Sequence, residues 1–183
     1  MTGQINVNKI AARTGSAITI ASGHVIHQPG SVIQTVSGET ETDTTISSTS
    51  FVDTTLTATI TPKFASSKIA IWVNQSVYLY RTNYTPQDGL MAGIRLMRDS
   101  TLVNQGYSDA TGGLHPYLTI GNATSTYFSF WHNLSVIDSP NTTSATVYKT
   151  QAELRNNTNQ IIRLQIASST TNKSTIILQE IAQ

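Results

Sequence analysis

The sequence lacks cysteine altogether, which excludes disulfide bonds and thiolate metal ligands. Charged residues make up only 11% of the 183 residues, against roughly 25% in an average soluble protein. The net charge is +1 and no basic run occurs, so we expect no nucleic-acid partner. The apolar runs fall far short of the roughly 18 residues that a membrane-spanning helix needs, and no secretory signal follows Met1. We therefore expect neither membrane insertion nor a signal peptide.

Serine and threonine supply about a quarter of the chain, and β-branched residues alternate with polar ones over most of its length. No window shows apolar spacing typical of a helix over three turns, whereas Gly, Pro, Asn and Asp separate short alternating segments. This pattern predicts an all-β fold, a sandwich or a barrel, with about eight to ten strands in the main domain. Of the two, we expect an antiparallel β-sandwich. The expected strands cover residues 31–37, 40–47, 51–61, 67–81, 89–98, 101–107, 124–137, 145–154, 160–168 and 174–182.

The strands differ in what their second face carries. The strand at 51–61 alternates apolar residues with threonines, as expected of a sheet that faces water. Three other strands, at 67–81, 124–137 and 174–182, are apolar or aromatic on both faces, and a surface of that size normally marks an interface. We therefore expect sister subunits to pack there. The candidate interface residues are Trp72, Tyr78, Tyr80, Tyr127, Trp131, Ile177 and Ile181.

Residues 1–30 differ from the rest of the chain. They hold short β-type pieces, such as Ile5–Val7 and Ile18–Ile20, separated by Gly15, Gly23 and Gly30. Strands this short are marginal in water unless they find a partner. The chain is therefore expected to consist of an attachment or oligomerisation arm, residues 1–30, and a β-sandwich head domain, residues 31–183.

Three stretches carry a resemblance to a known family: "GQINVNKIAARTGSAITIASG", the head start "PGSVIQTVSGETETDTTISSTSFVDTTLTATITPKFASSKIAIWV", and "DSPNTTSATVYKTQAEL" with the terminal "STIILQEIA". Over nearly its whole length the chain resembles the trimeric fibre-head domains of tailed bacteriophages, marine-phage-like and related in shape to the complement-C1q and tumour-necrosis-factor heads. The resemblance implies a jelly-roll sandwich that forms a homotrimer on the phage particle. It also implies that residues 1–30 dock on another virion protein, and that the chain is made in the host cytoplasm.

Catalytic and metal-binding patterns are sparse. No G-x-S-x-G motif, P-loop or dinucleotide fingerprint occurs, so we expect no enzyme and no cofactor. Glu39, Glu41 and Asp43 cluster on one strand and could bind calcium or form a glycosidase pair, although a solvated hairpin face is the simpler interpretation. His24 and His27 would point to opposite faces of a strand, so a metal could bind them only if three copies met on a trimer axis. We therefore expect no metal.

Two long segments, 80–89 and 106–121, are rich in Tyr, Asn, Asp and Gly. Tyrosine rings beside amide and carboxylate groups suit stacking on sugars, and loops on a rigid β scaffold are where binding usually resides. The same tyrosines could instead cover the end of the sandwich or contact the next subunit. The candidate receptor-binding residues are Tyr84, Asp88, Tyr107, Asp109, His115 and Tyr117.

The expected function is that of a small tail-fibre or fibre-tip protein that attaches the virion to a host surface glycan. A capsid decoration or head-fibre protein is one alternative. A free-standing lectin-like carbohydrate-binding module is another, but such a module would have no need of the arm at residues 1–30.

Overall fold

The computed structural model describes residues 28–82, 90–105, 125–154, 159–166 and 172–183, and these residues form ten strands and no helix. The strands are β1 (Val32–Thr40), β2 (Thr44–Ile46), β3 (Val52–Ile60), β4 (Lys68–Thr82), β5 (Ala92–Arg98), β6 (Thr101–Gln105), β7 (Ser125–Asp138), β8 (Thr146–Leu154), β9 (Gln160–Leu164) and β10 (Ser174–Ile181). Each predicted strand has one counterpart among them. The all-β prediction is therefore confirmed, whereas residues 1–27 of the predicted arm lie outside the described residues.

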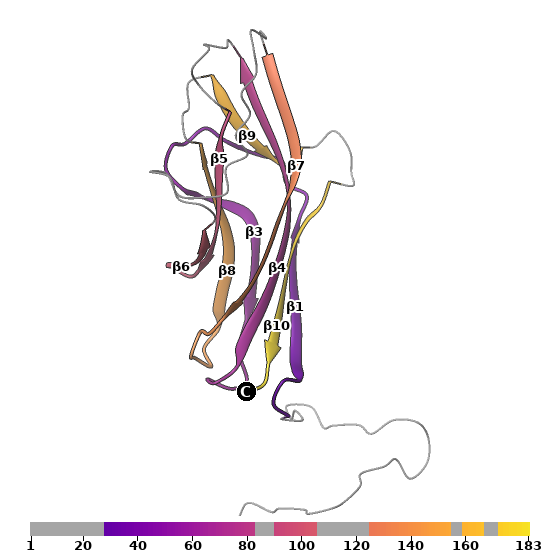
Figure 1. The fold of residues 1–183 in the computed structure, drawn as a ribbon, viewed down its shortest axis with the longest axis vertical. Helices are drawn as coiled ribbons and strands as arrows, with labels where there is room; N and C mark the ends of the chain where they lie inside the picture. Colours follow the sequence, from indigo (N-terminus) through magenta and orange to yellow (C-terminus); the bar gives the residue numbers. More distant parts are fainter. Residues whose placement is uncertain (1–27, 83–89, 106–124, 155–158, 167–171) are drawn as a thin grey trace, which may run out of the picture.

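The strands form two antiparallel sheets that face each other as a sandwich (Figure 1). The six-stranded sheet has the order β1-β10-β4-β9-β2, with β7 paired to the other edge of β4, and the four-stranded sheet has the order β3-β8-β5-β6. β4 pairs with β7 over Ile69–Thr82, and its opposite edge is shared: β10 pairs with Lys68–Asn74 and β9 with Val77–Arg81. The long β4 therefore holds the whole sheet together.

Period-two alternation explains which side chains enter the core. On β3, Leu56, Ala58 and Ile60 are buried while the threonines between them are exposed. On β4 the buried set is Ile69, Ile71, Val73, Val77 and Leu79. Successive side chains of a strand point to opposite faces, so a run of this kind buries one face and leaves the other to solvent or to a partner.

The core consists of two apolar clusters, one around Leu79, Ile94 and Leu154 and the other around Ile71, Tyr148 and Leu178. Buried polar side chains separate them. Gln75 lies between Val73 and Val77 on β4, and Thr150 lies between Tyr148 and Ala152 on β8. The Thr150 hydroxyl is 2.6 Å from the Thr54 hydroxyl on β3. A polar layer thus crosses the middle of the sandwich.

At one end of the sandwich a buried carboxylate fastens the turn between β3 and β4. Glu180 is fully buried on β10, and its Oε1 accepts hydrogen bonds from the backbone amides of Lys63 (2.8 Å) and Phe64 (3.2 Å). Its Oε2 accepts a third hydrogen bond, 2.6 Å long, from the Gln34 side-chain amide. Because the Glu180 carboxylate accepts all three hydrogen bonds, they hold β1 and the turn to β10 more firmly than bonds between neutral groups would.

Candidate assembly surface

All seven predicted interface residues lie on the outward face of the six-stranded sheet. They come from β4 (Trp72, Tyr78, Tyr80), from β7 (Tyr127, Trp131) and from β10 (Ile177, Ile181), and in each strand their parity is opposite to that of the buried core residues. The strand register brings several of them side by side: Trp72 is the Cα partner of Ile177, and Tyr80 is the partner of Tyr127. We call this outward face of β4, β7 and β10 the aromatic face.

The aromatic face exposes large apolar side chains to an unusual degree. Trp72 is 43% exposed, Trp131 48% and Tyr127 60%. Ile137 on β7 is 62% exposed and belongs to the same face, although the sequence analysis did not include it among the interface candidates. Its parity with Tyr127 and Trp131 was the signal that could have identified it. Single exposed apolar residues are common on proteins, but a contiguous group of this kind normally marks an interaction site.

Three tyrosines form a cluster at the end of the aromatic face. The Tyr80 and Tyr127 rings are stacked with centroids 5.2 Å apart, and Tyr78 lies 6.1 Å from Tyr127 and 6.5 Å from Tyr80. Burial among these rings raises the pKa of Tyr78, and the neighbouring phenols add to the effect. Ring pairs at these distances stabilise one another, so the cluster is held together without any partner.

Two hollows lie on the aromatic face. The first, of ≈ 510 Å³, is lined by Tyr78 and Trp131 together with Ser76, Ser129, Arg163 and Asn172. It lies where β9 has ended at Leu164 and β10 has not yet begun at Ser174. Here the Ser76 amide donates to the Ser174 hydroxyl at 2.9 Å and its carbonyl accepts from the Gln165 amide at 3.4 Å, in place of a regular ladder. The second, of ≈ 420 Å³, is lined by Trp72, Asn74, Asn133, Ser135, Thr175 and Ile177. Both hollows combine indole rings with amide and hydroxyl groups.

Charge is scarce on the aromatic face, where Lys68 at the start of β4 is the one charged residue in an outward position. The outward positions from Trp72 to Thr82 on β4, from Tyr127 to Ile137 on β7 and from Thr175 to Ile181 on β10 hold no Asp, Glu, Lys or Arg. Arg163 on the neighbouring β9, which lines the first hollow, forms an ion pair with Asp43. The cores of protein interfaces are likewise depleted in charge and enriched in Tyr and Trp.

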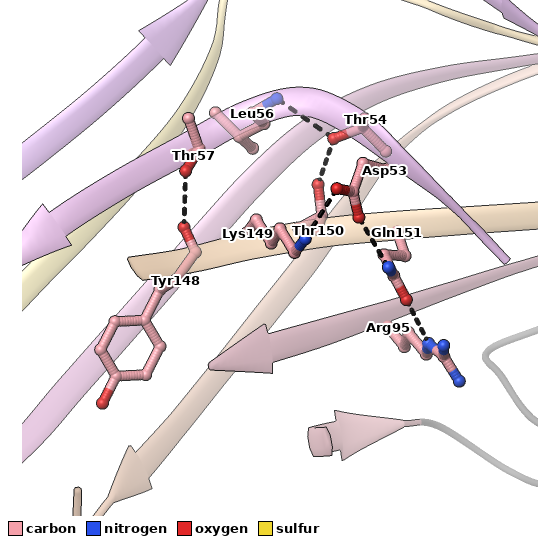
Figure 2. A network of polar contacts seen from close by, with 9 residues as sticks. All are labelled: Asp53, Thr54, Leu56, Thr57, Arg95, Tyr148, Lys149, Thr150 and Gln151. Carbon is pink, nitrogen blue, oxygen red and sulfur yellow. Dashed lines mark hydrogen bonds and ion pairs between the residues drawn. The ribbon is translucent and has the colours of Figure 1, made fainter. Parts of the chain in front are cut away.

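The outward face of the four-stranded sheet is the opposite in character (Figure 2). Asp53 on β3 accepts hydrogen bonds from Lys149 Nζ and from Gln151 Nε2 on β8, both 2.6 Å long. Arg95 on β5 extends this hydrogen-bond network by donating to Gln151 Oε1 at 2.8 Å. Its guanidinium lies 3.9 Å from the centre of the Phe51 ring. The hydrogen bond from Lys149 lowers the pKa of Asp53. One sheet thus presents a charged network and the other an aromatic surface with few charges.

The acidic cluster proves to be a set of ion pairs. Lys173 Nζ lies 3.1 Å from Glu39 and 3.3 Å from Glu41, while Asp43 pairs with Arg163. Each carboxylate is therefore paired with a cation, and Lys173 serves two of them, as expected of a solvated hairpin face. Within the described ranges no three His, Asp or Glu side chains are grouped so as to hold a metal ion. His24, His27 and His115 lie outside those ranges.

The predicted receptor-binding residues Tyr84, Asp88, Tyr107, Asp109, His115 and Tyr117 all lie outside the described residues. Their role remains a prediction. In the part of the chain that is described, no helix has the length and apolar character needed to cross a membrane.

Comparison with known proteins did not assign the chain to a family. No family model matches it, and a search of curated proteins found no match.

Proposed function

We propose that the protein is a virion structural protein of a tailed phage, which assembles as a homotrimer through the aromatic face and attaches the particle to a host surface. The observation that carries the proposal is the exposed aromatic face, whose outward positions hold no Asp or Glu and one cation, Lys68. Identical surfaces that meet each other must not repel. The part of the face that begins at Trp72 on β4 holds no charged residue and satisfies this condition. No catalytic role is proposed.

The size of the aromatic face suits assembly. β4, β7 and β10 have 15, 14 and 8 residues, which at about 3.3 Å per residue and about 4.8 Å between strands give roughly 600 Å² of sheet before the relief of the side chains is added. A stable interface buries about 800 Å² on each partner. Covering this face in a trimer would remove Trp72, Tyr127, Trp131 and Ile137 from water, at about 25 cal/mol per Å² of apolar area.

Strand order supports the jelly-roll part of the proposal. Without the short β2 and β9, the first sheet has the order β1-β10-β4-β7 and the second β3-β8-β5-β6. The first strand then pairs with the last, and consecutive strands alternate between the two sheets except from β5 to β6. Such interleaving is typical of the two Greek keys of a jelly roll. This architecture is the one that the resemblance to phage fibre heads implies.

Light scattering on the purified protein tests the assembly. We expect a particle of three times the 19.8 kDa chain mass. Replacing both Trp72 and Trp131 with lysine should dissociate it, because a lysine ammonium buried between copies has no counter-charge on this face. Thr59→Lys, on an exposed position of β3 in the other sheet, is the matched control and should leave the mass unchanged. A folded monomer of the unmodified protein at micromolar concentration would contradict the proposal.

A second candidate function, carbohydrate binding by a single copy, is favoured by the hollow between Tyr78 and Trp131. Its rings and the Arg163, Asn172 and serine groups could stack on a sugar and bind its hydroxyls. The two candidates differ in a simple measurement. If the unmodified protein is monomeric and a glycan array shows binding that Trp131→Ala abolishes, the aromatic face is a sugar site and not an interface between subunits.

A further inference from the structure

We infer that the free edge of β7 is a docking site for an added β-strand, and that residues 1–27 of this protein supply that strand. The inference concerns a different surface from the aromatic face, namely the backbone edge of β7 and the apolar side chains along it.

The first observation is the length and regularity of this edge. Among the described strands β7 pairs with β4 alone, over the 14 residues from Ser125 to Asp138 and without a break in register. From Ser125 to Ile137 it contains no charged residue and no proline. A long edge of this kind leaves a row of backbone N–H and C=O groups ready to pair with another chain.

The other sheet edges carry the features by which proteins prevent such pairing. β1 has a register irregularity between Val32 and Gln34 and bears Glu39, and β3 has one between Asp53 and Thr57. β2 has three residues, and β6 has five and an irregularity against β5. β7 is thus the one described edge that none of these features protects.

The second observation is an unfinished core beside the same edge. On the opposite side of the sandwich β1 lies against β3, where the Thr40 and Thr55 hydroxyls are 3.1 Å apart and Gln34 donates to the Thr61 carbonyl at 2.8 Å. On the β7 side, four inward-facing side chains pack on the two core clusters yet stay only half-buried: Phe128, Phe130, Leu134 and Val136. Their neighbours on β4 are completely covered. An added strand would cover these side chains as well as pair the backbone.

Reach and composition point to residues 1–27 as the occupant. The described chain begins at the end of the sandwich where β7 finishes: Gly30 donates to Ala182, Val32 pairs with Ile181, and Ile69 pairs with Asp138 (Figure 1). Three strand spacings of about 4.8 Å separate β1 from β7. A chain of 27 residues extends at most about 90 Å, which is enough to cross this end and follow β7 over its length of about 46 Å.

Within that segment, residues 16–22, "SAITIAS", are uncharged, and Ile18 and Ile20 fall on one face of a strand. Such an uncharged strand could pair with the uncharged edge of β7 through main-chain hydrogen bonds. Its two isoleucines would then cover the half-buried phenylalanines, or Leu134 and Val136. Main-chain pairing with side chains in alternate positions is the usual mode of β-strand addition.

Hydrogen exchange followed by mass spectrometry on the full-length protein tests the inference. About half of the β7 amides that point to the free edge should exchange at least about 10-fold more slowly than solvent-exposed amides, because a seven-residue strand covers about half of β7. The double variant Ile18→Pro/Ile20→Pro should abolish this protection, since proline cannot donate to a ladder. Thr2→Pro is the control and should preserve it, and β10 amides should stay protected in all three proteins.

Rapid exchange along β7 in the unmodified protein would overturn the inference, because the edge would then be open. Equal protection in the double proline variant would also overturn it, because another occupant, such as β7 of a second copy, would then cover the edge. Light scattering on the same samples separates this test from the test of the trimer. If the double proline variant keeps the mass of the unmodified protein but loses protection of the β7 amides, the effect concerns the β7 edge alone.

Discussion

Gln75 on β4 and His132 on β7 are Cα partners across the central ladder, and both side chains are buried. Among the described residues, neither side-chain amide atom of Gln75 has a hydrogen-bond partner. The same is true of His132 Nε2. On the other side of β4, Gln165 donates to the Ser174 hydroxyl at 2.6 Å and completes the polar layer. None of the four residues Gln75, His132, Gln165 and Ser174 is a carboxylate. A positive charge on the His132 imidazole would therefore have no counter-charge among them.

Acid should destabilise the fold through His132. Burial lowers the pKa of this imidazole below its ordinary value of 6.5. Between the pKa of His132 in the folded protein and that in the unfolded chain, the unfolded chain binds more protons. The free energy of unfolding is therefore highest above about pH 6.5 and decreases as the pH falls below it, by at most about 1.4 kcal/mol per pH unit. Urea titrations at about pH 7.5 and about pH 5 measure the difference.

His132→Gln is the matching control for this prediction, because a glutamine does not titrate and its stability should change less between the two pH values. Asp53 should not contribute in that range. Its pKa is lowered from 3.8, so its stabilisation is lost only in stronger acid. Equal acid sensitivity of the histidine and glutamine proteins would show that His132 does not cause the effect.

Removing the Glu180 carboxylate should loosen the end of the sandwich. Glu180→Ala leaves the Lys63 and Phe64 amides and the Gln34 side chain without their acceptor, and we expect a loss of about 3 kcal/mol in the free energy of unfolding. Glu180→Gln keeps one oxygen for the two backbone amides and should lose less. Chemical denaturation measures both variants, and equal losses would mean that the hydrogen bonds to the turn are not what matters.

Gly38 allows β1 to lie against β3. A Cβ atom at this position would lie 1.9 Å from the Thr57 carbonyl oxygen and 3.1 Å from the Ile176 side chain. Because the obstacle is backbone, Gly38→Ala must push the two strands apart, and we expect it to cost about 3 kcal/mol or more. At Gly93 the nearest atoms belong to the Glu153 and Phe51 side chains, at 3.1 and 3.2 Å, so Gly93→Ala should cost about 1 kcal/mol. Thermal unfolding ranks the two.

The tyrosines of the predicted receptor loops offer a test of attachment. Replacing Tyr84, Tyr107 and Tyr117 with alanine should leave the melting temperature almost unchanged while reducing adsorption of the particle to cells, since several weak sites together produce firm attachment. If the substitutions lower the melting temperature and spare adsorption, these rings are packing groups, and a capsid decoration protein becomes the better proposal.

Much of the fold could be predicted because alternation and turn chemistry are local. The ten strands follow from period-two patterns and from the Gly, Pro, Asn and Asp residues between them, and the second apolar face of β4, β7 and β10 is visible in the same way. The side chains of the aromatic face were therefore identifiable from their parity alone, Ile137 included.

Only the tertiary structure decided which strands are neighbours, because pairing depends on contacts between residues far apart in the chain. The change of partner along β4 from β10 to β9 creates the hollow beside Tyr78 and Trp131. The meeting of Gln75 with His132 and the open edge of β7 arise in the same way. An alternating pattern determines which face of a strand a side chain occupies, but it contains no information on what lies beside that strand.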